Sequence, residues 1–567
     1  MYNIKRLVFA INPKRFFLCF SVIWILTNLV QSVYTEIHSD EAYYLIYGEN
    51  PAWGYFDHPP AVGLMTYISG LFFSGNLAVR FLTVLFQFFT LVFIWKLIDG
   101  KLADTGKVVL FAIISSSTVM FQAYGFITTP DVPFLFFTAL FLIVYKRFLR
   151  GESWGNVCLL AISMAGMIYS KYHAVLVIGL ILLSNPRILA RYRFWLAGLF
   201  ATGLLIPHIY WQISMDFPSF KYHLSDRSSH FRWSYFLEYI PNQLAVFNPF
   251  TFAAAIYISV KYKPKDVFDR GLYFLFTGFI LFFWIMSFRG HVEPHWTVVC
   301  TIPMIILVYR YSLQDRRVMK YVKYGIFPSI ALIYLARVLL VADVLPKRLD
   351  FYGKEERYKA IETVAGELPV IFTGSFQNPS NYHFFTGKES TVLSAVNTRK
   401  TQFDILQKEL DYQGKPALVC AVIPDKSQEY NVDGVKFHAF KAQNFQSVNR
   451  LEINFELQNK EVYINDTLHI TFEISNPTGF TADFRHPEFP VSWKAVYHTD
   501  IKKFEFRDCI IDGEITTLPA HTKIKGVLKT AVPDLDVSDC RFALSLDNTV
   551  CYAQNSKFVL LSLKKND

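Results

Sequence analysis

The segment Thr35–Pro60 reads TEIHSDEAYYLIYGENPAWGYFDHPP and directly follows an apolar run, Phe16–Val33, that is long enough to cross a membrane. Aromatic side chains alternate with its charged residues, as is typical of a chain that lies at a membrane interface. Acidic groups beside a bilayer are costly unless they are used, so the segment predicts a functional site. The alternative is a solvated acidic loop with an aromatic belt. The charged residues are Glu36, His38, Asp40, Glu41, Glu49, Asp57 and His58.

The composition indicates a protein that is largely embedded in a membrane. Of the 567 residues, 52% are hydrophobic, only 18% are charged and 55 are Phe, which is more than a soluble core uses. The formal charge of +10 comes from short Lys and Arg runs between apolar segments. That pattern is a membrane topology signal and excludes a nucleic-acid partner. No cleavable signal peptide is recognisable, and the seven Cys include no CxxC pair of a zinc site.

Eleven membrane spans are predicted from the apolar runs. Between the first two, Pro59-Pro60 opens a short run, Ala61–Phe73, which we interpret as an interfacial or re-entrant helix. Lys and Arg fall in alternate loops, which places those loops in the cytoplasm and the acidic segment outside. The spans after Phe16–Val33 are Leu77–Ile98, Val108–Phe126, Val132–Tyr145, Val157–Tyr169, Ala174–Leu183, Phe194–Trp211, Leu244–Val260, Leu272–Phe288, Trp296–Tyr309 and Tyr324–Val341.

The chain changes character after Val341, where mixed polar sequence replaces the runs of Phe and Leu. Helix and strand patterns alternate over residues 346–445, which predicts a small α/β domain. Short strands separated by turn signals fill residues 446–567, which predicts a β-sandwich. The fold class is therefore a polytopic α-helical membrane protein with C-terminal α/β and β-sandwich domains on the outer side.

The acidic segment and the first outer turns supply the candidate catalytic carboxylates. Asp40 and Glu41 point in different directions on a helix, so one can act as a base while the other orients or binds. The alternative is a charge pair that stabilises the helix dipole. Asp57 and His58 are aimed by the two prolines that follow, or they form a plain turn. Asp131 caps its helix, works in the site, or does both.

The other outer loops add residues suited to bind an anion. Lys171 either snorkels to the surface or binds a phosphate, and Arg227 suits bidentate phosphate contact. The segment His291–His295 has an HxExH pattern that differs from a helical HExxH zinc site, so a divalent metal is possible but phosphate binding or capping is favoured. The predicted substrate-binding set is Tyr43, Asp57, His58, Lys171, Tyr172, His173, Arg227, Arg289, His291, Glu293 and His295.

These motifs together resemble those of polyprenyl-phosphate-sugar-dependent glycosyltransferases of the GT-C fold. The nearest group is the protein-mannosyltransferase-like family, which includes the aminoarabinose transferases that modify lipid A. The resemblance covers Met1–Val341. Aminoarabinose transferases carry Lys before the double Pro, where this chain has His58, so the donor sugar is not implied. The motifs are SDEAYYLIYGE, WGYFDHPPAVGLM, TTPDVPFLFF, SKYHAVL, PHIYWQ, DFPSFKYH and EPHWT.

The resemblance implies inverting transfer from a polyprenyl-phosphate sugar donor to lipid A, another glycan or a protein Ser/Thr. It implies that Asp40 is the base, with Glu41 and Asp131 completing the catalytic set. Basic groups such as Lys171, Arg227 or Arg289 would meet the charge of the leaving phosphate. Asp40→Asn is then expected to abolish transfer and Glu41→Gln to be milder. The implied location is a bacterial cytoplasmic membrane.

Two other classes of protein fit parts of the sequence. A transporter or flippase of lipid-linked sugars would place its charges at the bilayer midplane and in paired repeats. Here the charges lie at the outer ends of the spans, and no repeat is recognisable. A membrane-anchored glycan-binding protein would leave the outer-loop charges unexplained.

The cysteines carry a separate expectation. Cys19, Cys158 and Cys300 fall in or beside spans and are expected to be buried and reduced. Cys420, Cys509, Cys540 and Cys551 fall in the outer part, where disulfides can form. Cys540 and Cys551 flank the predicted hairpin RFALSLDNTVCYA, so they are the favoured pair. The alternative is that all four stay reduced.

Overall fold

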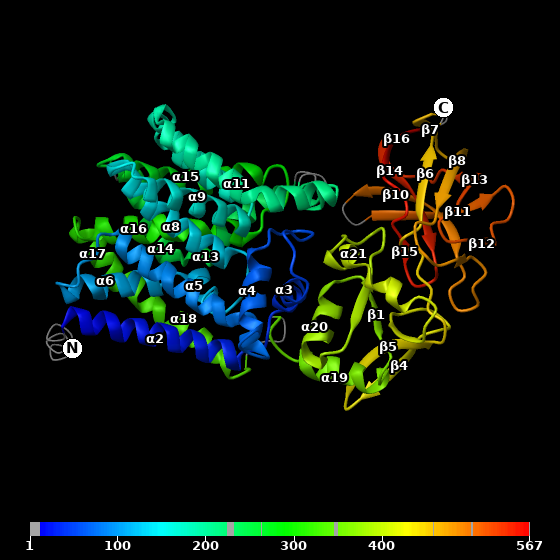
Figure 1. Cartoon of the computed structure of the whole chain (residues 1–567), viewed down its shortest axis with the longest axis horizontal. Helices are drawn as coiled ribbons and strands as arrows, with labels where there is room; N and C mark the ends of the chain where they lie inside the picture. Colours follow the sequence, from blue (N-terminus) through cyan, green and yellow to red (C-terminus); the bar gives the residue numbers. More distant parts are fainter. Residues whose placement is uncertain are drawn as a thin grey trace. The chain divides into compact units, whose positions relative to one another are not determined.

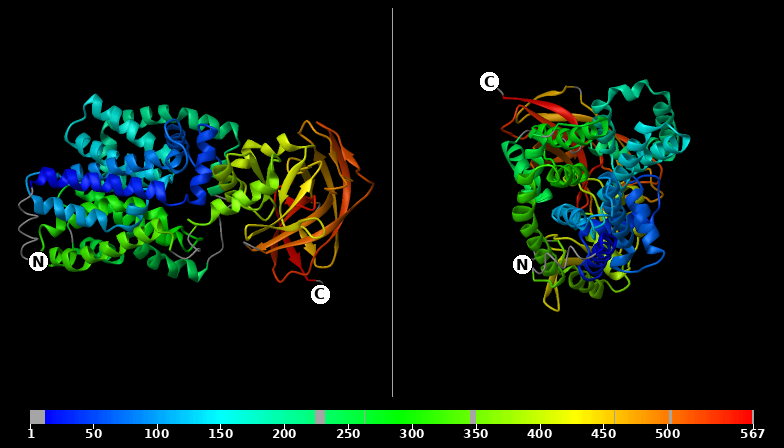
Figure 2. Two further views of the ribbon diagram at one scale, coloured as in Figure 1. Left: turned by 90° about the horizontal axis from the view of Figure 1, so that it is seen from below. Right: turned by 90° about the vertical axis from the view of Figure 1, so that its left-hand side faces the viewer.

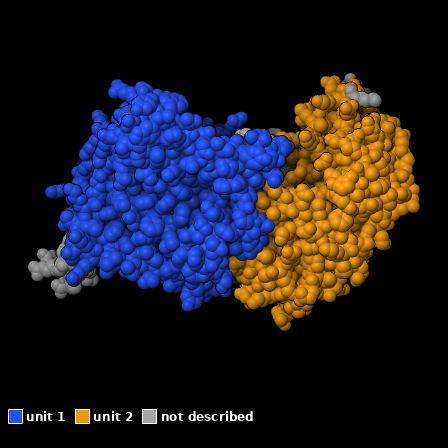
Figure 3. Space-filling view, in the orientation of Figure 1, with its two compact units in different colours: residues 1–352 blue, residues 353–567 orange. Residues whose placement is uncertain are grey.

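The computed structural model describes residues 12–223, 232–261, 263–344, 350–457, 459–500 and 503–565. The chain forms two compact units, Met1–Tyr352 and Gly353–Asp567 (Figure 3). Within the described ranges the first unit contains helices only, and every strand belongs to the second unit.

The first unit is a bundle of apolar helices that lie side by side in Figure 1 and in both views of Figure 2. Six helices are long and apolar enough to cross a membrane, and a pair bent by 107° makes up to seven. The six are α2 (Pro13–Tyr34), α5 (Asn76–Leu97), α8 (Asp131–Arg150), α11 (Tyr192–Ser214), α15 (Val267–Met286) and the run of α17 (Arg316–Tyr321), a π-helical turn and α18 (Phe327–Val341); the bent pair is α13 (Trp233–Phe247) and α14 (Pro249–Lys261).

The polytopic helical fold is confirmed, whereas the number of eleven crossings stays a prediction because several expected spans are short or broken. Val108–Phe126 is not one helix but α6 (Thr105–Ser116) followed by α7 (Val119–Ala123). At the break, the hydroxyl of Ser117 donates to the carbonyl of Ile114 at 2.7 Å, as hydroxyl side chains do at helix ends. The other short helices are α3 (Ser39–Glu49), α4 (Ala61–Gly70), α9 (Trp154–Ser170), α10 (Ala174–Ser184), α12 (Pro218–Lys221) and α16 (Thr301–Ser312), with 3-10 turns at Pro186–Ala190 and Pro294–Cys300.

The second unit begins with a five-stranded sheet in the order β2-β1-β3-β5-β4. The central β1 is parallel to β2 and β3, and β5 is antiparallel to β3 and β4. Helices α19 (Lys354–Ala365) and α20 (Gln377–Thr386) pack on this sheet. The remaining elements are β1 (Val370–Thr373), β2 (Ser390–Leu393), α21 (Gln402–Leu406), a 3-10 turn (Lys408–Tyr412), β3 (Ala417–Cys420), β4 (Gln428–Val432) and β5 (Val435–Ala442).

A nine-stranded sheet follows in the order β6-β8-β13-β11-β10-β14-β16-β7, with β15 beside β14. Strand β11 joins its two halves, because Lys503–Asp508 pairs with β10 and Cys509–Ile511 pairs with β13. Both halves contribute to one apolar core, so the sheet closes over itself as a sandwich. The strands are β6 (Glu452–Glu456), β7 (Glu461–Tyr463), β8 (Thr467–Ser475), β10 (Ser492–Asp500), β11 (Lys503–Ile511), β13 (Lys523–Ala531), β14 (Asp539–Asp547), β15 (Tyr552–Ala553) and β16 (Val559–Lys564); β9 (Ala482–Asp483) and β12 (Thr517–Leu518) pair separately.

The cysteine expectations need two corrections. All seven cysteines are free, so the favoured Cys540–Cys551 disulfide is wrong. Cys540 opens β14 opposite β16, whereas Cys551 lies beyond the other end of β14, in the turn before β15. The length of the strand therefore separates the two thiols. Cys19 and Cys158, which were expected to be buried, lie exposed on the outside of the helix bundle, and only Cys300 is buried as predicted.

Candidate functional site

The acidic segment folds as α3, and a capping box closes its first turn. His38 precedes the helix, and its Nδ1 accepts a hydrogen bond from the backbone N–H of Asp40 at 3.2 Å. The carboxylate of Glu41 accepts a hydrogen bond from the backbone N–H of His38 at 2.9 Å. Asp350 accepts a further hydrogen bond from the N–H of Ser39 at 3.0 Å. Asp40 therefore lies in a helical turn whose backbone is held from several sides.

Glu41 is fully buried and is the counter-ion of Arg80, a buried residue of α5. Arg80 donates from Nε to Oε1 at 2.8 Å and from Nη2 to Oε2 at 2.6 Å. Oε1 also accepts from the backbone N–H of Thr128 at 2.8 Å. With the N–H of His38, four donors surround this carboxylate. The expectation that Glu41→Gln affects transfer less than Asp40→Asn stays a prediction, but we now expect Glu41→Gln to lower stability, because removing one partner of a buried ion pair is strongly destabilising.

Three carboxylates from different segments act on the phenol of Tyr44. Burial raises the pKa of Tyr44 well above its ordinary value, and the negative charges of Asp40, Asp57 and Asp131 raise it further. Such an effect requires the charges to be near the phenol. Asp57 and Asp131 are themselves buried, and the hydroxyl of Tyr47 donates to Asp57. Asp40 is only partly buried, which makes it the most accessible of the three.

Basic side chains collect beside Asp131. Lys171 donates from Nζ to Oδ1 of Asp131 at 2.7 Å, and both side chains are buried. His173 follows in the same outer turn. Burial lowers the pKa of His173 well below its ordinary value, and nearby positive groups lower it further. Those groups are Lys171, His223, His295 and His58. The structure thus brings predicted residues from four separate segments into one cluster.

The C-terminal end of α11 holds the loop that leads to the double proline. Nδ1 of His208 donates to the carbonyl of Trp53 at 2.6 Å, and Nε2 lies 3.2 Å from the hydroxyl of Tyr172. Gly54 lies against the ring of Trp211 so closely that a Cβ there would be 2.3 Å from it. Tyr172, predicted to bind substrate, is therefore hydrogen-bonded within this loop contact.

The other predicted residues are placed differently. Tyr43 is buried and packs against the tyrosine rings of its own helix. His291 and Glu293 lie 3.6 Å apart as a half-exposed pair, and Arg289 is exposed. Arg227 lies outside the described residues. Within the described ranges, the structure contains no group of three His, Cys, Asp or Glu that could hold a metal ion.

An apolar groove of about 450 Å³ lies beside the loop that precedes the double proline, where α4, α8 and α9 meet. Its walls are mostly aromatic and aliphatic side chains, so it suits a hydrocarbon ligand better than a sugar. The residues include Pro51, Trp53, Tyr55, Leu64, Tyr67, Phe137 and Tyr169.

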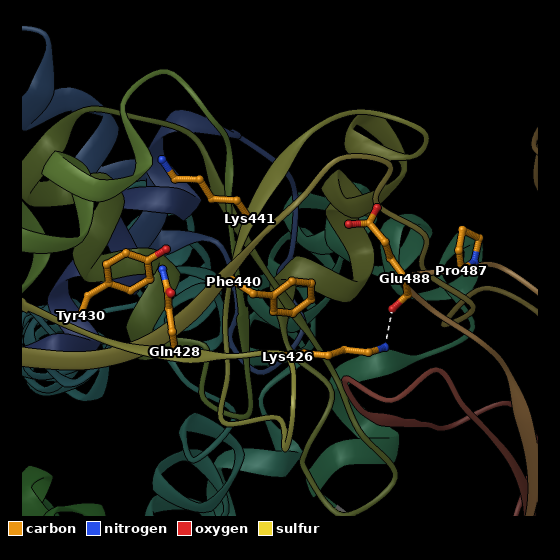
Figure 4. Close-up of a pocket in the computed structure, with 7 residues that line it drawn as sticks. All are labelled: Lys426, Gln428, Tyr430, Phe440, Lys441, Pro487 and Glu488. Atoms are coloured by element: carbon orange, nitrogen blue, oxygen red, sulfur yellow. Dashed lines mark hydrogen bonds between the residues drawn. The ribbon is translucent and has the colours of Figure 1, made fainter.

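A second hollow, of about 460 Å³, lies in the second unit and is mostly polar (Figure 4). Lys426 reaches across one side of it and donates to the main-chain oxygen of Glu488 at 2.6 Å. None of the residues predicted for the site lines this hollow. The predicted site residues all have numbers within the first unit, Met1–Tyr352.

Comparison of the chain with known proteins gives one family match and several structural alignments. Residues 57–211 match the family described as dolichyl-phosphate-mannose-protein mannosyltransferase. The crystal structure of ArnT from Cupriavidus metallidurans in the apo state aligns with a TM-score of 0.57 and 12% identity, covering 75% of this chain and 98% of ArnT. The chain has the GT-C fold.

Two further solved structures align with this chain. ArnT from Cupriavidus metallidurans bound to undecaprenyl phosphate aligns with a TM-score of 0.54 and 13% identity, covering 75% of this chain and 97% of ArnT. The arabinofuranosyltransferase AftD from Mycobacteria aligns with a TM-score of 0.44 and 10% identity, covering 97% of this chain and 60% of AftD. A search of curated protein sequences finds no match.

Two buried arginines of this GT-C chain did not enter the sequence-based prediction. Arg80 lies within the predicted span Leu77–Ile98. Arg337 lies in α18, and its described side-chain partners are all neutral. It donates from Nε to Gln31 at 3.2 Å, from Nη1 to Gln122 at 2.6 Å and from Nη2 to Asn28 at 2.8 Å. A basic residue inside an apolar run was the signal that could have found both.

Proposed function

We propose that this protein is a membrane glycosyltransferase that moves a sugar from a polyprenyl-phosphate carrier to an acceptor on a lipid, glycan or protein. The observation that carries the proposal is the meeting of three carboxylates with the basic cluster around the Asp131–Lys171 pair. The family matched over residues 57–211 is described by a lipid-phosphate-sugar donor, and one ArnT structure holds undecaprenyl phosphate.

Asp40 is the base of the proposed reaction. Glu41 is bound to Arg80 and Asp131 to Lys171, whereas Asp40 is only partly buried. Asp40 takes the proton of the acceptor hydroxyl while that oxygen bonds to the anomeric carbon of the sugar. The bond from this carbon to the phosphate oxygen breaks on the opposite side, so the configuration inverts. Glu41 and Asp131 act by holding the surrounding turns.

The leaving phosphate is stabilised by the cluster around His173. Lys171 supplies an ammonium group, and neighbouring histidines supply N–H donors at the outer ends of the helices. Phosphate is a good leaving group, so no general acid is required. The apolar groove beside Trp53 accommodates part of the isoprenoid chain. Its walls provide hydrophobic burial and no charge, as a hydrocarbon ligand requires.

The proposed location is the cytoplasmic membrane of a bacterium, with the site and the second unit on the outer side. A flippase is the weaker proposal, because a carrier's charges belong near the midplane of the bilayer. Here Asp131 begins α8 and Lys171 directly follows α9, so the ion pair lies at helix ends.

Mass spectrometry of envelope glycolipids and glycoproteins tests the proposal. Cells with the wild-type protein should contain a glycosylated product that is missing from cells without it. Asp40→Asn should abolish the product at unchanged protein level, because it removes the base and keeps the shape. The matched control is Asp99→Asn, the same change at an aspartate that follows α5 and pairs with Lys146, which should leave the product intact. Identical profiles with and without the protein would refute the transferase, and an active Asp40→Asn enzyme would refute the base.

A further inference from the structure

The segment Asp350–Tyr352 leads from the last span towards the second unit and lies against the start of α3. Oδ2 of Asp350 accepts from the N–H of Ser39 at 3.0 Å and lies 3.6 Å from Nε2 of His38. The ring of Phe351 meets the ring of His38 edge-on at 5.5 Å. The hydroxyl of Tyr352 donates back to a carbonyl of α18. This connecting segment is thus fixed at both ends, on α18 and on His38.

His38 is an unusual helix cap, because Ser, Thr, Asp or Asn normally occupies that position. Its Nδ1 can accept the N–H of Asp40 only when it carries no proton. The proton of the neutral ring is then on Nε2, which is the nitrogen that faces Asp350. A carboxylate at Nε2 favours this tautomer and fixes the plane of the ring. If Nδ1 were protonated, two N–H groups would point at each other and the cap would be lost.

Asp40 lies between two anchored residues of this turn. On one side Glu41 is bound to Arg80 deep in the bundle. On the other side His38 caps the backbone of Asp40 and faces Asp350. The first anchor is fully buried, whereas the second is partly exposed and depends on Asp350, which lies 311 residues after Ser39.

We propose that Asp350 is a positioning residue for Asp40, acting through His38, so that the segment leading into the second unit completes the transfer site. This inference rests on the proposed function, in which Asp40 is the base. It assigns no contact between Asp350 and substrate. Its effect should therefore fall on turnover and leave the binding of the lipid carrier unchanged.

The test compares Asp350→Asn with Asp343→Asn, an exposed aspartate two residues after the end of α18. Product formed per protein molecule should fall about fivefold in Asp350→Asn, the size of a lost helix cap, and should stay normal in Asp343→Asn. The purified full chain should bind undecaprenyl phosphate with unchanged affinity in all variants. If Asp350→Asn also lowered carrier binding fivefold, or lowered the amount of folded protein by as much, its role would be structural and the inference would be overturned.

His38→Asn separates action through His38 from any other effect, because Asn caps a helix without depending on a tautomer. In this background Asp350→Asn should change turnover less than twofold. A fivefold loss in both backgrounds, or normal turnover of Asp350→Asn in the wild-type background, overturns the inference. Activity of Asp40→Asn would instead refute the proposed base and the inference with it.

Discussion

Replacing Glu41 by Gln turns one oxygen of a fully buried carboxylate into an NH₂ group. Oε1 has the Nε of Arg80 and the N–H of Thr128 as donors, and Oε2 has the Nη2 of Arg80 and the N–H of His38. Whichever oxygen becomes nitrogen, an NH₂ group then points at two N–H groups. Arg80 also keeps its charge in a buried position without its counter-ion.

The expected loss follows from these contacts. Two hydrogen bonds to a charged group disappear, each worth about 1.5–3 kcal/mol. Their sum agrees with the loss of about 3–5 kcal/mol for breaking a buried ion pair. The folded first unit should lose this much stability, which corresponds to a lower melting temperature on the order of 5 °C for a unit of this size.

Thermal unfolding of the purified protein in detergent, followed by tryptophan fluorescence, measures the effect. Asp40→Asn is the matched control, since it is the same chemical change one residue earlier at a partly exposed side chain. Asp40→Asn should melt near the wild type without making product, and Glu41→Gln should melt lower. Adding Arg80→Gln to Glu41→Gln should recover part of the loss, because it removes the uncompensated charge. A Glu41→Gln protein that melts within 1 °C of the wild type would refute the reasoning.

Three further outcomes are expected. Reporter fusions in the first unit should report the cytoplasm after Lys101, Arg150, Arg193, Lys265 and Lys320. Fusions after Gly374 and Leu451 should report the outer side. A single second-unit fusion that reports the cytoplasm would refute the eleven-span topology. Gly54→Ala should lower product at least tenfold, because its Cβ would lie 2.3 Å from Trp211. Gly198→Ala, which has open space around it, should form product normally. Equal product from both variants would refute the role of the loop contact. Thiol titration of the unfolded chain without reductant should count all seven cysteines, and a lower count that reductant restores would contradict the free thiols.

Much of the fold could be predicted because the bilayer imposes simple rules. Apolar runs fixed where helices lie, and the alternation of basic loops indicated which helix ends share a side. That is why Asp131, Lys171 and His173, from different turns, were predicted to lie on the same side as Asp40. Breaks inside apolar runs were harder to predict. The break after Ser116 depends on hydroxyl side chains whose alternative hydrogen bonds carry little weight in a hydropathy pattern.

The partners within the site could not be predicted, because they depend on packing between distant segments. Glu41 meets Arg80 across 39 residues and Thr128 across 87. Sequence spacing alone could not tell which member of the Asp40-Glu41 pair is buried. The failed disulfide has a similar cause, because the predicted hairpin did not give the register that places Cys540 opposite Leu561 of β16 and Cys551 in the turn before β15.

Arg337 bears on the order in which the membrane helices assemble. Arg337 lies four residues before the end of α18, and a charged side chain inside a membrane helix costs free energy unless it finds partners. The partners that offset such a cost, Gln122 and Asn28, lie 215 and 309 residues earlier in the chain. Because synthesis starts at the N-terminus, these helices are in the membrane before α18 leaves the ribosome. Retention of the last span in the bilayer therefore depends on the first, and a chain deprived of α2 should release α18 during biogenesis.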